Sequence, residues 1–127
     1  MRSAIFCKRS ILCPKGDGGA GKSAEELSKD VSNKYKQNGQ CDKYADSLEQ
    51  KMKDVGVKGE RIKVNSKANI YSDKNGLIGN DFHDAIKVGD RVFDNMNPDG
   101  VPFTEWAKDL GIGEVADITW EVIRNIN

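Results

Sequence analysis

The hydrophobic pattern of this 127-residue chain changes its period once, near Gly59. Before that point apolar residues recur every three or four positions, which is typical of helices that bury one face. After it, short runs of strand-forming residues are separated by turn residues, which is typical of hairpins. Helices followed by an antiparallel sheet predict an α+β fold in a single domain. Besides the elements argued below, we expect strands at 61–64, 69–71 and 118–123 and a helix at 104–110.

The first 22 residues show no sustained period and end in a glycine-rich run. We therefore expect residues 1–22 to form a weakly ordered tail or linker and residues 23–127 to form the domain. The segment 16–23 satisfies the phosphate-loop pattern, which binds nucleotide only when a buried strand delivers it within a parallel sheet. Residues 10–14 are a poor strand, so we interpret the glycines as a linker and Ser23 as a helix N-cap.

Two helices are predicted in the first half of the chain. The first begins at Ser23, which has capping-box spacing with Glu26, and ends at the Asn-Gly pair at 38–39. The second begins at Cys41, or one residue earlier, and ends before Gly56. Cys41 shares the buried stripe of this helix with apolar residues four and seven positions later. A thiol in the first turn of a helix feels the positive end of the helix dipole, which favours the nucleophilic thiolate.

The clearest hairpin pairs 82–88 with 91–94 through a two-residue Gly-Asp loop. In this register His83 and Asp94 lie on the same face of the hairpin, close enough for the carboxylate to accept the imidazole proton. Asn95 is the alternative orienting residue, but it points to the opposite face unless the loop gains a residue. We favour Asp94.

A cysteine at a helix start, followed by a histidine and a carboxylate on strands, is typical of a thiol hydrolase. The other interpretation is a buried structural cysteine and an ordinary surface histidine. Gln37 and Gln40 are oxyanion candidates, because an amide just upstream of the nucleophile can donate a hydrogen bond to a developing alkoxide. Either glutamine fits equally well as a solvated helix end.

Composition excludes several classes of function. The 20 basic and 20 acidic residues balance, so no overall field directs the chain toward nucleic acid or membrane. No apolar run is long enough to span a bilayer. Cys7, Cys13 and the single histidine cannot complete a standard zinc site, so we expect no metal and no cofactor.

Several short motifs occur together in the order of a known family. These are Gly39-Gln40-Cys41-Asp42-Lys43-Tyr44-Ala45, Phe82-His83-Asp84-Ala85-Ile86, Val92-Phe93-Asp94-Asn95, Gly100 and Glu105-Trp106. Over residues 24–110 the chain resembles the papain-fold toxin domains of bacterial polymorphic toxin systems. The resemblance implies a papain-like fold with the nucleophile at a helix N-terminus.

The resemblance also implies a function in interbacterial competition of the contact-dependent growth inhibition type. The domain would be the C-terminal module of a larger secreted toxin, delivered to the cytoplasm of a target bacterium and neutralised by a cognate immunity protein. Cys41 would be the nucleophile, His83 the general base and then acid, and Asp94 the orienting group of a peptidase or glutamine deamidase. No glutamine stands at an unambiguous papain-like oxyanion position.

Two other functions remain open from the sequence. A ribonuclease toxin on a papain-like scaffold would use His83 as acid or base toward a ribose 2′-hydroxyl of tRNA or other RNA, and Cys41 would be structural. A non-catalytic binding module would merely pack Cys41 in its core.

Overall fold

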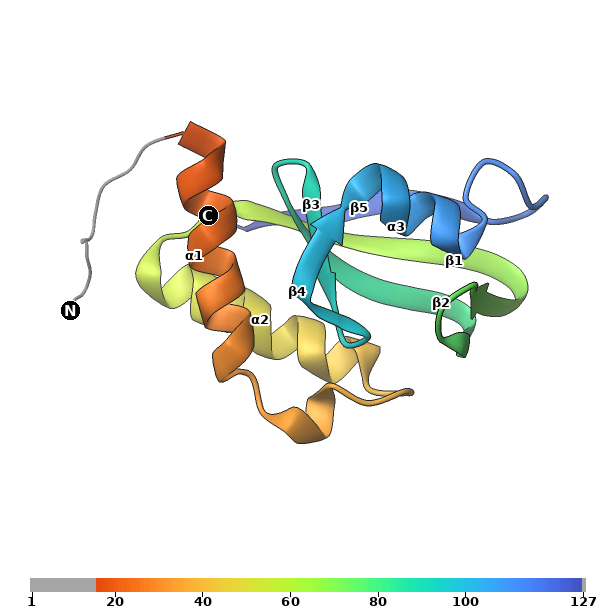
Figure 1. Cartoon of the computed structure of the whole chain (residues 1–127), viewed down its shortest axis with the longest axis horizontal. Helices are drawn as coiled ribbons and strands as arrows, with labels where there is room; N and C mark the ends of the chain where they lie inside the picture. Colours follow the sequence, from red (N-terminus) through yellow and green to blue (C-terminus); the bar gives the residue numbers. More distant parts are fainter. Residues whose placement is uncertain (1–15, 127) are drawn as a thin grey trace.

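The computed structural model describes residues 16–126 and shows two helices, a five-stranded antiparallel sheet and a third helix before the last strand (Figure 1). The elements are α1 (Gly16–Asp30), the 3-10 helix η1 (Asn33–Tyr35), α2 (Cys41–Val55), β1 (Gly59–Ser72), β2 (Gly76–Val88), β3 (Arg91–Asp94), β4 (Asn97–Pro102), α3 (Phe103–Leu110) and β5 (Thr119–Ile126). The strand order is β4-β3-β2-β1-β5. The predicted α+β fold is confirmed.

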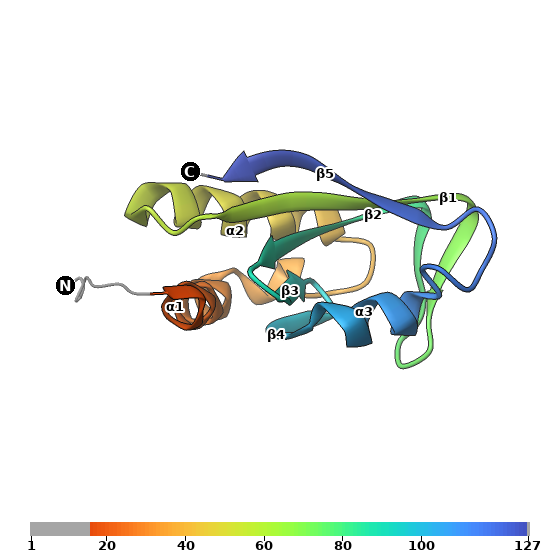
Figure 2. The ribbon, with the colours of Figure 1, turned by 90° about the horizontal axis from the view of Figure 1, so that it is seen from above.

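The sheet has a core on each face. Ile86 and Phe93 pack with α1 and α2, whereas their sequence neighbours Ala85 and Val92 pack with Trp106 of α3. This separation follows from the alternation of side chains along a strand. Figure 2 shows α1 and α2 toward one end of the molecule and α3 toward the other. Within residues 16–126, no helix has the length and apolar character needed to cross a membrane.

The first helix differs from its prediction at both ends. It begins at Gly16, so Ser23 lies inside α1 rather than at its N-cap, and the segment 16–22 is helical rather than a linker. Within α1, Ala24 is buried in the core that α2 shares and Leu27 packs against this core, and a helix held by such packing extends at low cost once nucleated. Because 16–23 is helix, it does not form the loop that a phosphate-loop site requires. The part of the predicted tail at 1–15 lies outside the described residues.

α1 ends at Asp30 instead of continuing to 38–39. Ser32 has a non-helical backbone, and its hydroxyl accepts a hydrogen bond from the Lys34 backbone N–H at the start of η1. Local side-chain bonding of this kind competes with helix continuation.

The strands differ from the prediction in three places. β4 was not predicted, and β2 begins at Gly76 rather than at residue 82. The two strands expected at 61–64 and 69–71 are parts of the single strand β1, which has an irregularity between Asn65 and Asn69 where it pairs β2. The predicted hairpin is confirmed, because Val88 pairs Arg91 and Ile86 pairs Phe93.

Candidate functional site

The centre of the candidate site is a buried ion pair between neighbouring strands. His83 on β2 donates through Nε2 to Oδ2 of Asp94 on β3, over 2.8 Å. The hairpin register places both side chains on the same face, as predicted, and the structure shows that α3 covers this face. Both side chains are almost fully buried.

Asp94 is held by three further hydrogen bonds. Trp106 Nε1 donates to the same Oδ2 over 2.9 Å, while the Met96 backbone N–H and Asn97 Nδ2 donate to Oδ1 over 3.0 and 2.9 Å. Burial raises the pKa of Asp94, but the hydrogen bonds from His83, Trp106 and Asn97 outweigh it and hold the pKa below its usual range. Asp94 is therefore a fixed carboxylate.

Cys41 is the first residue of α2, where the sequence predicts it, and its side chain is only 7% exposed. It is a free thiol among the described residues. Asp94 occupies Nε2 of His83, and Nδ1 has no hydrogen-bond partner in the described part of the chain. Cys41 nevertheless lies near enough to affect the titration of His83. We infer that Nδ1 is the ring nitrogen left for the sulfur.

The charge state of His83 follows from these neighbours. Burial alone lowers the pKa of His83, because a buried imidazolium loses its hydration. The hydrogen bond to Asp94 and the interaction with Cys41 act in the opposite direction and raise the pKa to about 10. At neutral pH the ring is therefore an imidazolium that lies between the Asp94 carboxylate and the Cys41 sulfur.

Residues 23–111 match the family described as papain fold toxin 2. The chain belongs to this family. The match begins within α1 and ends just after α3, so it includes Cys41, His83 and Asp94 but not β5. No curated protein and no solved structure matches the chain.

In this papain fold toxin 2 domain, Asn95 is not the hydrogen-bond partner of His83. Its side chain is buried and donates through Nδ2 to the backbone oxygen of Gln37 over 2.7 Å. Asn95 therefore connects the β3–β4 turn to the loop before Cys41. The Gln37 side chain is exposed, and Gln40 is the partly buried residue that precedes α2. Gln40 makes no side-chain capping bond, so its amide remains free of the helix end.

Trp106 and Tyr44 are both buried. Their polar roles were not predicted from the sequence. Trp106 donates to Asp94, and the Tyr44 hydroxyl is hydrogen-bonded to Ser28, whose Oγ donates to the Pro98 oxygen over 2.6 Å. Only the requirement that buried indole and phenol groups find partners could have indicated these contacts.

No group of three or more His, Cys, Asp or Glu side chains within residues 16–126 is arranged to hold a metal ion. The three side chains that the site brings together are the Cys41 sulfur, the His83 imidazolium and the Asp94 carboxylate. Such a set can carry nucleophilic attack and proton transfer.

Proposed function

We propose that this toxin domain is a thiol hydrolase with peptidase or deamidase chemistry. Cys41 is the nucleophile, His83 is the general base and then the acid, and Asp94 orients His83. The observation that carries the proposal is the 2.8 Å His83–Asp94 hydrogen bond combined with the effect of Cys41 on the same ring. The chemistry needs a nucleophile beside a base, and a third group that orients the base. Membership of a papain fold toxin family supports the same assignment.

The proposed reaction has two halves. The Cys41 sulfur attacks the carbonyl carbon of a peptide or carboxamide while its proton resides on His83. The imidazolium then protonates the departing nitrogen, which leaves as an amine or as ammonia, and a thioester remains on Cys41. His83 next takes a proton from water, whose oxygen attacks the thioester and releases a carboxylic acid and the thiol.

The position of Cys41 supports the first step. The first N–H groups of a helix have no acceptor within the helix, and the helix dipole favours an anion at that end. A negative sulfur at the first residue of α2 therefore lies where the fold stabilises charge. The backbone of this turn and the side chains of Gln37 and Gln40 are the proposed donors to the oxyanion.

Family membership also supports a biological setting. We propose that the domain acts after delivery into a target bacterium as part of a larger secreted toxin. A cognate immunity protein would protect the producing cell. The macromolecular substrate would be a protein of the target cell.

Inducible expression in bacteria tests the hydrolase. Wild type should stop growth, whereas Cys41→Ser and His83→Ala should grow normally, with Cys13→Ser as the matched cysteine control that remains toxic. Full toxicity of Cys41→Ser would overturn the thiol mechanism, and fragmented tRNA in the arrested cells would support a ribonuclease instead. A harmless wild-type chain that binds a partner tightly would support a binding module.

Iodoacetamide labelling of the purified chain near neutral pH provides a second test. Cys41 should react faster than Cys7 and Cys13 and should lose this advantage in His83→Ala, because the imidazolium that stabilises the thiolate is absent. Equal reactivity in the two proteins would contradict the proposal.

A further inference from the structure

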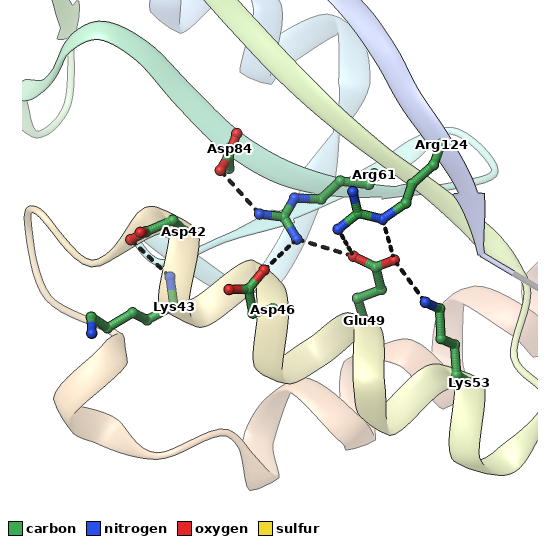
Figure 3. Close-up of polar contacts among 8 residues, drawn as sticks. All are labelled: Asp42, Lys43, Asp46, Glu49, Lys53, Arg61, Asp84 and Arg124. Carbon is green, nitrogen blue, oxygen red and sulfur yellow. Dashed lines mark hydrogen bonds and ion pairs between the residues drawn. The ribbon is translucent and has the colours of Figure 1, made fainter.

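A cluster of charged side chains joins α2 to the sheet (Figure 3). At its centre Arg61 of β1 donates through Nη1 to Asp46 over 2.8 Å and to Glu49 over 3.0 Å, both on α2. Its Nη2 donates to Asp84 on β2 over 3.0 Å. Arg61, Glu49 and Asp84 are buried. Arg61 therefore connects one helix to one neighbouring strand through a single guanidinium.

Two further cations complete the cluster. Arg124 of β5 donates to both oxygens of Glu49, over 2.7 and 2.8 Å, and Lys53 lies 3.3 Å from Oε2. Burial raises the pKa of Glu49, but Arg124, Lys53 and Arg61 together lower it to about 2. On the α2 side of the connection, Glu49 is therefore permanently ionised.

The two elements that Arg61 joins are those that carry the proposed nucleophile and base. Asp46 and Glu49 follow Cys41 by five and eight residues, which is about 7 and 12 Å along the helix. Asp84 is the residue after His83 and, by strand alternation, points to the opposite face of β2. A displacement of α2 against β2 at Arg61 would thus change the distance between the sulfur and the imidazole.

We propose that Arg61 is a positioning residue that sets the separation of Cys41 and His83, an inference that rests on the proposed hydrolase function. A guanidinium is planar and presents its donors in fixed directions, so it fixes the helix carboxylates and the strand carboxylate relative to each other. A lysine ammonium carries the same charge without that geometry. Buried ion pairs add little net stability compared with apolar packing, so positioning is the property that this cluster supplies.

The test measures how strongly Cys41 and His83 sense each other. His83 is the only histidine of the chain, so its ring resonances are assigned without ambiguity and its pKa can be followed by NMR. The difference in this pKa between the full chain and its Cys41→Ser variant is the coupling of the pair. The same difference is then measured between the Arg61→Lys variant and the double variant Arg61→Lys/Cys41→Ser. All of the proteins are made by cell-free synthesis.

We expect Arg61→Lys to reduce the coupling to less than about half, because contacts within one network are energetically coupled. Arg124→Lys is the matched control: it makes the same change on Glu49 but has no bond to Asp84, and it should keep the coupling. Any direct electrostatic effect of replacing the arginine on the pKa of His83 cancels from the coupling, because it is the same whether residue 41 is cysteine or serine.

An unchanged coupling in folded Arg61→Lys would overturn the positioning role and leave the hydrolase proposal intact. If Arg61→Lys does not fold, Asp84→Asn provides the same test by breaking only the strand contact, with the same two outcomes. Absence of any coupling in the wild-type chain would instead overturn the hydrolase proposal, and the positioning role with it.

Discussion

His83 donates to Asp94 across adjacent strands over 2.8 Å, and both members of this ion pair are buried beneath α3. A buried charge pair is stable only when its remaining hydrogen-bonding groups are also satisfied. Asp94 meets this condition through Trp106, Met96 and Asn97. On His83 only Nδ1 is left without a partner among the described residues, and this is the atom that the proposed chemistry uses.

Replacing Asp94 by asparagine should abolish most of the activity. Whichever way the new amide is oriented, its NH₂ group faces two donors, either His83 and Trp106 or Met96 and Asn97. The pKa of His83 should fall from about 10 toward its ordinary value. We expect a loss of activity of about ten-thousandfold, as for other neutralised orienting carboxylates.

NMR titration of the single histidine measures the fall in the pKa of His83. Survival of induced cells measures the loss of activity. Asp99→Asn is the control, because Asp99 is an exposed carboxylate on the neighbouring strand β4. A His83 pKa that stays raised in Asp94→Asn would contradict the assignment.

The stability of the domain should decline as the pH rises above neutrality. The pKa of His83 is about 10 in the folded chain and 6.5 ordinarily, so between these values the folded state holds a proton that the unfolded state lacks. Stability therefore decreases with pH across this window and is fully present below about 6.5. The total effect is about 5 kcal/mol as an order of magnitude, because each pH unit contributes about 1.4 kcal/mol.

Urea unfolding at intervals from pH 6 to pH 10 measures this decline. His83→Gln is the reference, because it removes the titrating group and leaves the lysines and tyrosines unchanged. The difference in unfolding free energy between the two proteins should shrink with rising pH. A constant difference would show that the histidine is not charged in the folded state.

The contact between His83 and Asp94 could be predicted from the sequence because both residues lie in one hairpin. The two-residue Gly89-Asp90 loop defines the register, and strand alternation then defines the faces. The position of Cys41 at the start of α2 could also be predicted from nearby residues, because a glycine lies just before it and an apolar stripe follows it.

The Arg61 cluster could not be predicted in this way. Its members come from α2, β1, β2 and β5, and their contacts depend on how these elements pack. A charged residue in a strand is usually on a solvated face, so nothing in the local pattern of Arg61 indicated burial. The helical start at Gly16 was missed for a related reason, because low glycine propensity was outweighed by the packing of the rest of α1.

Ser28 and Tyr44 should be energetically coupled. Ser28 uses its single proton on the Pro98 oxygen, so the Tyr44 hydroxyl donates to Ser28 Oγ, and this chain connects α1, α2 and β4. Ser28→Ala should lower the unfolding free energy by about 2 kcal/mol and Tyr44→Phe by about 1 kcal/mol. The double variant should lose about as much as Ser28→Ala alone, because the Tyr44 bond is already absent there.

Urea unfolding of the four proteins gives the coupling. Ser32→Ala is the control, since Ser32 is exposed and makes only a 3.4 Å contact with the Lys34 backbone. Additive losses would show that the Tyr44 hydroxyl does not depend on Ser28.

Alanine substitutions at Gly100 and Gly113 distinguish the cost of backbone strain from the cost of a steric clash beside the site. Both have positive φ, +85° and +87°, so alanine at either position carries a similar backbone cost of about 1 kcal/mol. A Cβ at Gly100 would lie 2.6 Å from the ring of Phe93, which is fully buried and precedes Asp94 on β3. A Cβ at Gly113 would meet nothing within 4 Å. Gly100→Ala should therefore cost about 1–3 kcal/mol more than Gly113→Ala in urea unfolding.

Because a displaced Phe93 moves Asp94 with it, Gly100→Ala alone should also shift the His83 resonances. Equal costs and unchanged resonances would mean that the ring moves aside without disturbing the ion pair.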